Sequence, residues 1–93
     1  MIKTFKDKET RKIFFNEFSK HLPEAIQERA AQKLYMIEAA GHLEDLRLPP
    51  SNHLEKLKGN RNRQYSIRIN SQWRICFFWE NDSAYEVEIT DYH

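Results

Sequence analysis

Apolar residues in the first half of the chain recur at helical spacing. After the β-favouring residues 2–5, Asp7 is a suitable N-cap, and the apolar positions that follow predict a first helix: Ile13, Phe14 and Phe18. Pro23 suits the first turn of a second helix and Gly41 its C-terminal end, with apolar residues every three or four positions between them: Ile26, Ala30, Leu34 and Ile37. We therefore expect a short strand followed by two helices.

The second half of the chain changes to a two-residue period. Residues 42–53 include two adjacent prolines and predict a crossing loop with about one helical turn. Beyond it, apolar and polar residues alternate over residues 65–69, 73–79 and 85–89, which predicts three consecutive antiparallel strands. The expected fold class is α+β, with two N-terminal helices packed on a small antiparallel sheet in a single domain of residues 1–93.

A three-residue loop at residues 70–72 keeps every apolar residue of the first two strands on one face. It pairs Ile67 with Ile75 and sets Arg68 directly opposite Arg74 on the other face. Two cations that face each other across strands are unfavourable unless an anion lies near them.

The third strand is expected to supply that anion. Its apolar residues should share the face of Ile75, and this arrangement places Glu88 near Arg74: Tyr85, Val87 and Ile89. The same register lays the end of the chain alongside residues 70–74.

Composition excludes several classes of site. Two glycines leave no Gly-rich phosphate loop, and the four histidines lack metal-ligand spacing, so we expect no cofactor and no metal. The single cysteine, Cys76, cannot form an intrachain disulfide and should be a packed strand residue rather than a nucleophile. The longest apolar run, Ile75–Trp79, is far shorter than the roughly 20 residues of a membrane-spanning helix. We expect a cytoplasmic protein without a membrane partner.

Charge is unevenly distributed although the formal net charge is only +1. The local balance is +1 over residues 1–50, +5 over residues 51–79 and −5 over residues 80–93. The central segment interleaves cations with Tyr65 and Trp73, as an RNA backbone with stacked bases requires: Lys56, Lys58, Arg61, Arg63, Arg68 and Arg74. The alternative is a solvated face on which Arg68 or Arg74 pairs with Glu86 or Glu88.

The last three residues, Asp91, Tyr92 and His93, are suited to proton transfer. Cleaving RNA needs a base for the 2′-OH proton, cations for the charge that develops on the phosphate, and an acid for the leaving 5′ oxygen. An imidazole beside a carboxylate and a phenol offers such groups near neutral pH, while Arg68 and Arg74 would hold the phosphate. An inert chain end is the alternative.

An ordered series of motifs runs through nearly the whole chain, from residues 1–5 and 43–50 to Leu57-Lys58-Gly59-Asn60-Arg61 and residues 65–70, 72–77 and 88–93. This series resembles the HigB-type toxins of the RelE/ParE superfamily, the toxin halves of bacterial type II toxin–antitoxin pairs. The resemblance implies a ribonuclease that acts on mRNA in the ribosomal A site and contacts ribosomal RNA. It also implies a partner, a helix-turn-helix antitoxin of the HigA type.

The resemblance further implies roles for single residues. Asp91, Tyr92 and His93 match the family's C-terminal catalytic group, Arg74 the residue that holds the scissile phosphate, and Lys58 an RNA or ribosome contact.

One position departs from the family pattern. Some members carry a catalytic histidine two residues before the leucine of Leu57-Lys58-Gly59, where this chain has Glu55, and His53 stands two residues earlier. Three readings stay open: Glu55 acts as the base, a loop shift brings in His53, or the enzyme is slower than its relatives.

Two other functions compete with RNA cleavage. One is a ParE-like gyrase inhibitor, and the other is a non-catalytic module that blocks translation by binding RNA or the ribosome. ParE-like toxins lack the Asp91-Tyr92-His93 ending, so its presence favours a nuclease.

Overall fold

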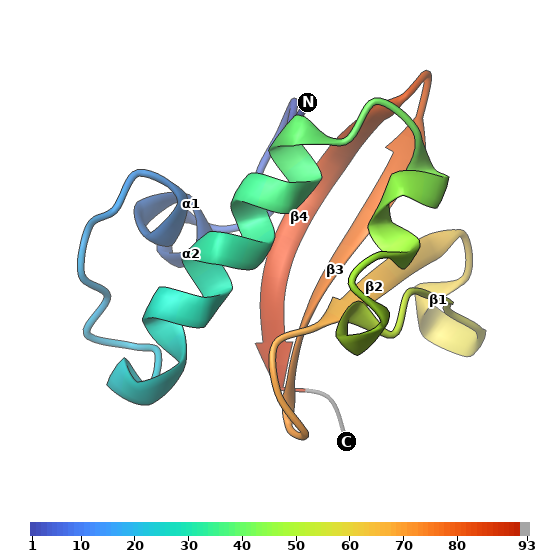
Figure 1. The fold of residues 1–93 in the computed structure, drawn as a ribbon. Coiled ribbons are helices and arrows are strands. Elements are labelled where there is room, and N and C mark those ends of the chain that lie inside the picture. The colour runs from blue at the N-terminus through green and yellow to red at the C-terminus, as the bar shows by residue number, and fades with distance from the viewer. Residues whose placement is uncertain (92–93) are drawn as a thin grey trace.

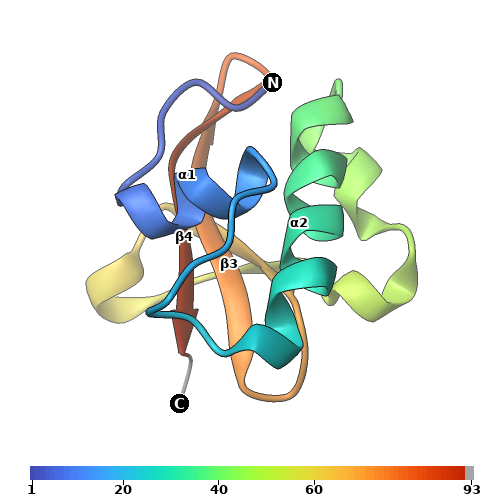
Figure 2. The ribbon, with the colours of Figure 1, turned by 90° about the vertical axis from the view of Figure 1, so that its left-hand side faces the viewer.

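Two helices lie on one face of a four-stranded antiparallel sheet in the computed structural model, which describes residues 1–91 (Figures 1 and 2). The helices are α1 (Lys8–Phe14) and α2 (Glu24–Ala39). The strands lie side by side in chain order: β1 (Glu55–Lys56), β2 (Gln64–Arg68), β3 (Trp73–Glu80) and β4 (Ser83–Asp91). The predicted α+β class is confirmed, and β1 is a strand that the alternation did not reveal.

Local signals set the ends of α1. The side chain of Asp7 accepts a hydrogen bond from the backbone N of Thr10 at 2.7 Å, as predicted for an N-cap. The helix ends at Phe14, and Asn16 follows with a left-handed φ of 62°, which turns the chain away from the helical path. Phe18 is consequently exposed, so its predicted place on the helical stripe is wrong.

The segment between α2 and β1 forms two 3₁₀ turns where the sequence predicted one helical turn. They are η1 (Leu43–Arg47) and η2 (Pro50–Asn52), and Leu46 of η1 is buried in the core. A third turn, η3 (Gly59–Arg61), connects β1 to β2.

Residues 2–5 run beside β4 but do not form the predicted strand. They make two separate parallel bridges, Ile2 to Ala84 and Phe5 to Val87. Between the two bridging positions of β4, Glu86 has a φ of 50°, which interrupts a regular ladder.

The register of β2 and β3 is the predicted one. Ile67 faces Ile75 and Arg68 faces Arg74, while the backbone N of Ile69 donates to the carbonyl of Trp73 at 2.8 Å. The three-residue loop therefore keeps the apolar side chains of both strands on the face that the helices cover.

The register of β4 contains a β-bulge that the sequence analysis missed. Pairing shifts between Cys76 and Phe78, and Phe78 faces Tyr85. Because paired residues share a face, Tyr85 lies on the face opposite the helices and not beside Val87 as predicted. A bulge adds one residue to the strand, so the alternation changes phase at that point.

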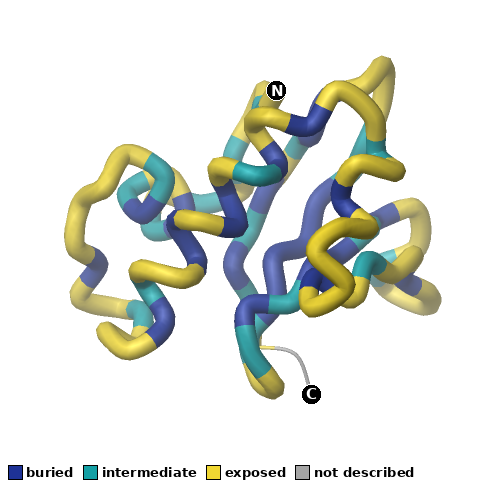
Figure 3. The backbone as a smooth tube through the Cα atoms, viewed as in Figure 1, coloured by how far each residue is buried: buried dark blue, intermediate teal, exposed yellow. Residues whose placement is uncertain are grey.

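The hydrophobic core lies between α2 and the sheet, and Figure 3 shows buried residues along both. Its largest fully buried side chains come from both layers: Leu34, Ile37, Ile67, Ile75 and Phe77. Each such side chain contributes roughly 1.5–3 kcal/mol by burial. Within residues 1–91, no helix combines the length and the apolar character that crossing a membrane requires.

Candidate active site

A row of side chains crosses the sheet on the face opposite the helices. Glu55 of β1 pairs with Ser66 of β2, Ser66 with Cys76 of β3, and Cys76 with Glu88 of β4. Since paired residues point to the same face, these four lie side by side, and Arg74 lies one alternate position further along β3 on the same face.

Contacts with Ser66, His53 and Glu55 help to fix Arg74 in place. Its Nε donates to the hydroxyl of Ser66 at 2.8 Å, and its Nη2 donates to the carbonyl of His53 at 2.7 Å. The same Nη2 lies 3.3 Å from the carboxylate of Glu55. The side chain of Arg74 is only 6% exposed whereas that of Glu55 is 52% exposed, so the ion pair joins a rigid buried cation to an accessible carboxylate.

The carboxylate that pairs with Arg74 at 3.3 Å is Glu55, which the sequence did not indicate. Glu88, which was expected near Arg74, lies on the same face of the sheet, one alternate position further along. Arg74 faces Thr90 of β4. Glu88 accepts from Arg61 at 3.1 Å and pairs with Lys6 at 3.4 Å. Glu55 was missed because β1, the two-residue strand that brings it to the edge of the sheet, was not expected from the sequence.

The C-terminal group is described only in part. Asp91 ends β4 opposite Trp73, so the predicted position of the chain end beside residues 70–74 is confirmed for this residue. The Oδ2 atom of Asp91 accepts from Gln72 Nε2 at 3.0 Å. Tyr92 and His93 lie outside the described residues, and their catalytic assignment stays a prediction.

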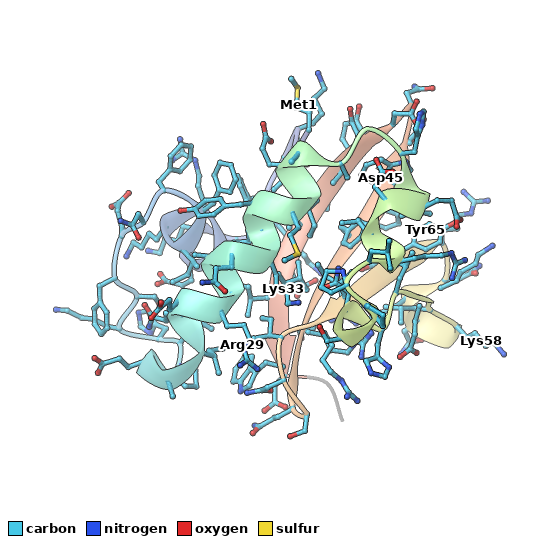
Figure 4. The ribbon with its side chains drawn as sticks, viewed as in Figure 1. Met1, Arg29, Lys33, Asp45, Lys58 and Tyr65 are labelled. Carbon is cyan, nitrogen blue, oxygen red and sulfur yellow. The ribbon has the colours of Figure 1, made fainter. Side chains whose placement is uncertain are left out.

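The predicted RNA-binding cations differ in their surroundings. Lys56, Lys58 and Arg63 are exposed, and Figure 4 shows Lys58 pointing away from the body of the protein on the side of β1. Arg61 is half-buried and donates to Gln64 at 3.3 Å in addition to Glu88.

Arg68 is also half-buried, and among residues 1–91 its buried Nε has no hydrogen-bond acceptor. The two aromatic residues proposed for base stacking, Tyr65 and Trp73, pack against the core instead. Their side chains share the helix-covered face with Ile67 and Ile75, so they do not lie among Arg68 and Arg74.

Two cations of α2, Arg29 and Lys33, were not identified from the sequence as candidate site residues. Lys33 is 7% exposed, and its Nζ donates to Asn52 Oδ1 at 2.6 Å. Burial, together with the nearby charge of Arg29, lowers the pKa of Lys33. A signal existed, because Lys33 lies three residues after Ala30 and four before Ile37, on the apolar stripe of α2.

Cys76 is fully buried, and this confirms that it is a packed strand residue. Burial raises the pKa of its thiol, which disfavours the reactive thiolate. Over the described part of the chain, no three His, Cys, Asp or Glu side chains gather closely enough to hold a metal ion.

Known proteins resemble most or all of this chain. The model of the RelE-like toxin of type II toxin–antitoxin system HigB matches residues 3–93. Toxin HigB-1 of Vibrio cholerae is 38% identical over 82 residues, which cover 86% of this chain and 85% of that protein. Endoribonuclease HigB of Proteus vulgaris is 32% identical over 93 residues, which cover all of both chains. An uncharacterized protein of Haemophilus influenzae is 43% identical over 63 residues, 68% of this chain but 62% of that protein's length.

The fold also occurs in a solved structure. A chain of the YoeB–YefM complex from Staphylococcus aureus superposes with a TM-score of 0.61 at 19% identity, over 100% of this chain and 98% of that one. At this identity the likeness shows the fold alone. The family match and the full-length relatives decide the family: the chain belongs to the RelE-like HigB toxins of type II toxin–antitoxin systems, as the sequence predicted.

Proposed function

We propose that this chain is an endoribonuclease that cleaves messenger RNA in the ribosomal A site. The observation that carries the proposal is the ion pair of Arg74 and Glu55, in which a buried guanidinium touches a half-exposed carboxylate on the face of the sheet opposite the helices. Its support is family membership, since a relative that matches the whole chain is named an endoribonuclease.

The two side chains suit the two demands of RNA cleavage. The 2′ oxygen attacks the adjacent phosphorus, so the O2′–P bond forms and the P–O5′ bond breaks. Glu55 accepts the proton of the 2′-OH, and Arg74 stabilises the negative charge that grows on the phosphate oxygens. The leaving O5′ takes its proton from the C-terminal group of Asp91, Tyr92 and His93.

The contact between Glu55 and Arg74 couples these steps. A carboxylate that takes up a proton loses its charge, and its attraction to the guanidinium falls. Arg74 is then available to the phosphate at the moment when charge develops there. His53 contributes its backbone carbonyl to Arg74, and this scheme assigns the proton acceptor to Glu55 rather than to the imidazole of His53.

We assign RNA binding to the basic segment, residues 51–79, which carries a local charge balance of +5. We assign contacts with the message or with ribosomal RNA to its five remaining cations: Lys56, Lys58, Arg61, Arg63 and Arg68. Each phosphate that such a cation neutralises makes binding more sensitive to salt. The family implies a partner as well, and we propose a cytoplasmic complex with a helix-turn-helix antitoxin of the HigA type.

Primer extension on a cellular message after induced expression tests the proposal. Cuts inside codons of translated messages are the expected result, and they should vanish with the Arg74→Ala variant. An intact message with stalled ribosomes would instead support a translation blocker without nuclease activity. A DNA-damage response without cuts would support a gyrase inhibitor.

A further inference from the structure

A second group of cations surrounds a cavity of about 490 Å³ between α2, η2 and the loop that joins β2 to β3. We call it the Arg68 cavity. Its lining includes Arg29 and Lys33 from α2, His53 after η2, Arg68 at the end of β2, and Ser71 of the loop. Within the described part of the chain, no aspartate or glutamate lines it. Figure 4 shows Arg29 and Lys33 extending from α2 toward the side where η2 and this loop lie.

The edge of the sheet leaves this cavity open. Strand β1 pairs only with Tyr65 and Ser66, so Arg68 lies beyond the end of β1. The segment of η2 passes there instead and places Asn52 and His53 beside β2. The cavity is therefore reachable from solvent along the same edge that carries Glu55.

Among residues 1–91, the cations of the cavity have no anionic partner. Arg68 faces Arg74 across the strands, and Arg74 has Glu55, whereas the buried Nε of Arg68 has no acceptor within residues 1–91. Lys33 donates to the neutral amide of Asn52, and Arg29 donates to the carbonyl of Ile69 at 3.4 Å. Buried donors are almost always paired, so this arrangement indicates an anion that binds from outside.

We propose that the Arg68 cavity binds a phosphate group of RNA, at a position separate from the scissile phosphate at Arg74. Donors approach from three elements, which suits a tetrahedral anion with oxygens on several sides better than a planar carboxylate, for which one guanidinium is sufficient. The inference rests on the proposed function, since RNA is the substrate that would bring a phosphate to this edge of the sheet.

His53 connects the cavity to the candidate active site. It is one of the residues that line the cavity, and its carbonyl accepts from Arg74. Its backbone is left-handed, with φ 45° and ψ 57°. His53 thus contacts both Arg74 and the Arg68 cavity. An RNA strand whose reacting phosphate lies at Arg74 can place another phosphate in the Arg68 cavity.

A titration of the full chain with inorganic phosphate tests the site without requiring catalysis. Nitrogen–proton correlation spectra at constant ionic strength should show saturating shifts of the Arg68 Nε–H and of the Ser71 amide. Phosphate affinity should fall by roughly tenfold or more in Arg29→Gln and in Arg68→Gln. Lys8→Gln removes the same charge from an exposed position on α1 and should leave it unchanged. Melting curves verify that each variant is folded.

Three outcomes of this titration would overturn the proposal. Shifts that match those caused by chloride would indicate a general effect of ionic strength. Shifts that do not saturate would indicate an adventitious ion only. Tighter binding of acetate than of phosphate would indicate a site for an acidic peptide.

The source of the phosphate is decided by a second measurement. Affinity for ribosomes is compared with and without a message in the A site, for the wild type and for Arg29→Gln. If Arg29→Gln loses affinity only for ribosomes that carry a message, the cavity binds a phosphate of the message. If it loses affinity equally for ribosomes with and without a message, the cavity binds a phosphate of ribosomal RNA. No loss on either would overturn the role in RNA binding. If no RNA were cut at all, the proposed function would fail, yet the phosphate titration would still report on the cavity.

Discussion

Arg74 and Glu55 pair at 3.3 Å although their strands, β3 and β1, are not neighbours in the sheet. Strand β2 lies between them, and at the crossing point it carries Ser66, which is fully buried. This small side chain leaves room for the guanidinium, and its hydroxyl oxygen accepts a hydrogen bond from Arg74 Nε. A small residue at position 66 is therefore a requirement of the ion pair.

Replacing Arg74 with Ala should lower the rate of cleavage by about 100- to 1,000-fold, the usual effect of removing one group that stabilises a developing oxyanion. Single-turnover cleavage of a ribosome-bound message measures this rate. Because Arg74 is buried, thermal unfolding must be measured in parallel, and Arg74→Lys keeps the charge but not the three contacts. Normal cleavage by folded Arg74→Ala would show that Arg74 is a structural residue.

Position 66 offers an independent test of the same geometry. Ser66→Leu fills the space where the guanidinium crosses β2 and should reduce cleavage nearly as much as Arg74→Ala. Ser66→Ala is the matched control, since it keeps the space and removes one hydrogen bond, worth about 0.5–1.5 kcal/mol. Equal cleavage by Ser66→Leu and Ser66→Ala would show that the space at position 66 is not required for catalysis.

The comparison of Glu55 and His53 separates the open readings of the internal base. Glu55→Gln should nearly eliminate cleavage, because it removes the proton acceptor beside Arg74, and His53→Ala should be tolerated. Glu55→His, which restores the histidine that some family members carry there, should retain activity with a shifted pH profile. Equal tolerance of Glu55→Gln and His53→Ala would assign the proton chemistry to the C-terminus alone.

The sequence predicted those parts of the fold that depend on local spacing. Alternation and loop length were sufficient to pair Ile67 with Ile75 and Arg68 with Arg74. The partner of Arg74 was missed because β1 has two residues and no period of its own, so nothing local placed Glu55 near it. The bulge at Glu86 was missed because it changes the phase of an alternation that otherwise continues.

The cations of the Arg68 cavity show the same division. Arg68 was identified from its segment, but Arg29 and Lys33 come from a helix that was interpreted only as a core element. Their meeting with Arg68 depends on the packing of α2 and η2 beside the edge of β2, and no sequence pattern describes that packing.

A C-terminal tag of a few residues, or deletion of His93, should abolish toxicity, whereas an N-terminal tag of equal length should not. Met1 bonds to Ala84 at the start of β4, and Asp91 ends that strand roughly 20 Å away. Figure 1 shows the N-terminus at the opposite end of β4 from Asp91. Growth after induction measures toxicity, and a C-terminally tagged protein that still cuts mRNA normally would exclude Asp91, Tyr92 and His93 from catalysis.

Cys76 should resist alkylation by iodoacetamide at pH 8 in the folded protein and react promptly in denaturant. Burial both blocks access and raises the thiol pKa, so the thiolate is scarce in the folded state. The thiol of the unfolded chain ionises at about pH 8.5. The free energy of unfolding should therefore fall as the pH rises above that value, and this fall should be smaller in Cys76→Ala. Fast labelling under native conditions would contradict this description of the strand.

Cleavage of a defined message by the purified protein on purified ribosomes tests the central claim most directly. Two messages are compared, one with ribose throughout and one with a single 2′-deoxy nucleotide at the expected cut in the A-site codon. The account predicts that the first is cut in that codon, leaving a 2′,3′-cyclic phosphate and a 5′-hydroxyl, and that the second stays intact. Equal cleavage of both messages, or no cleavage of either, would contradict it.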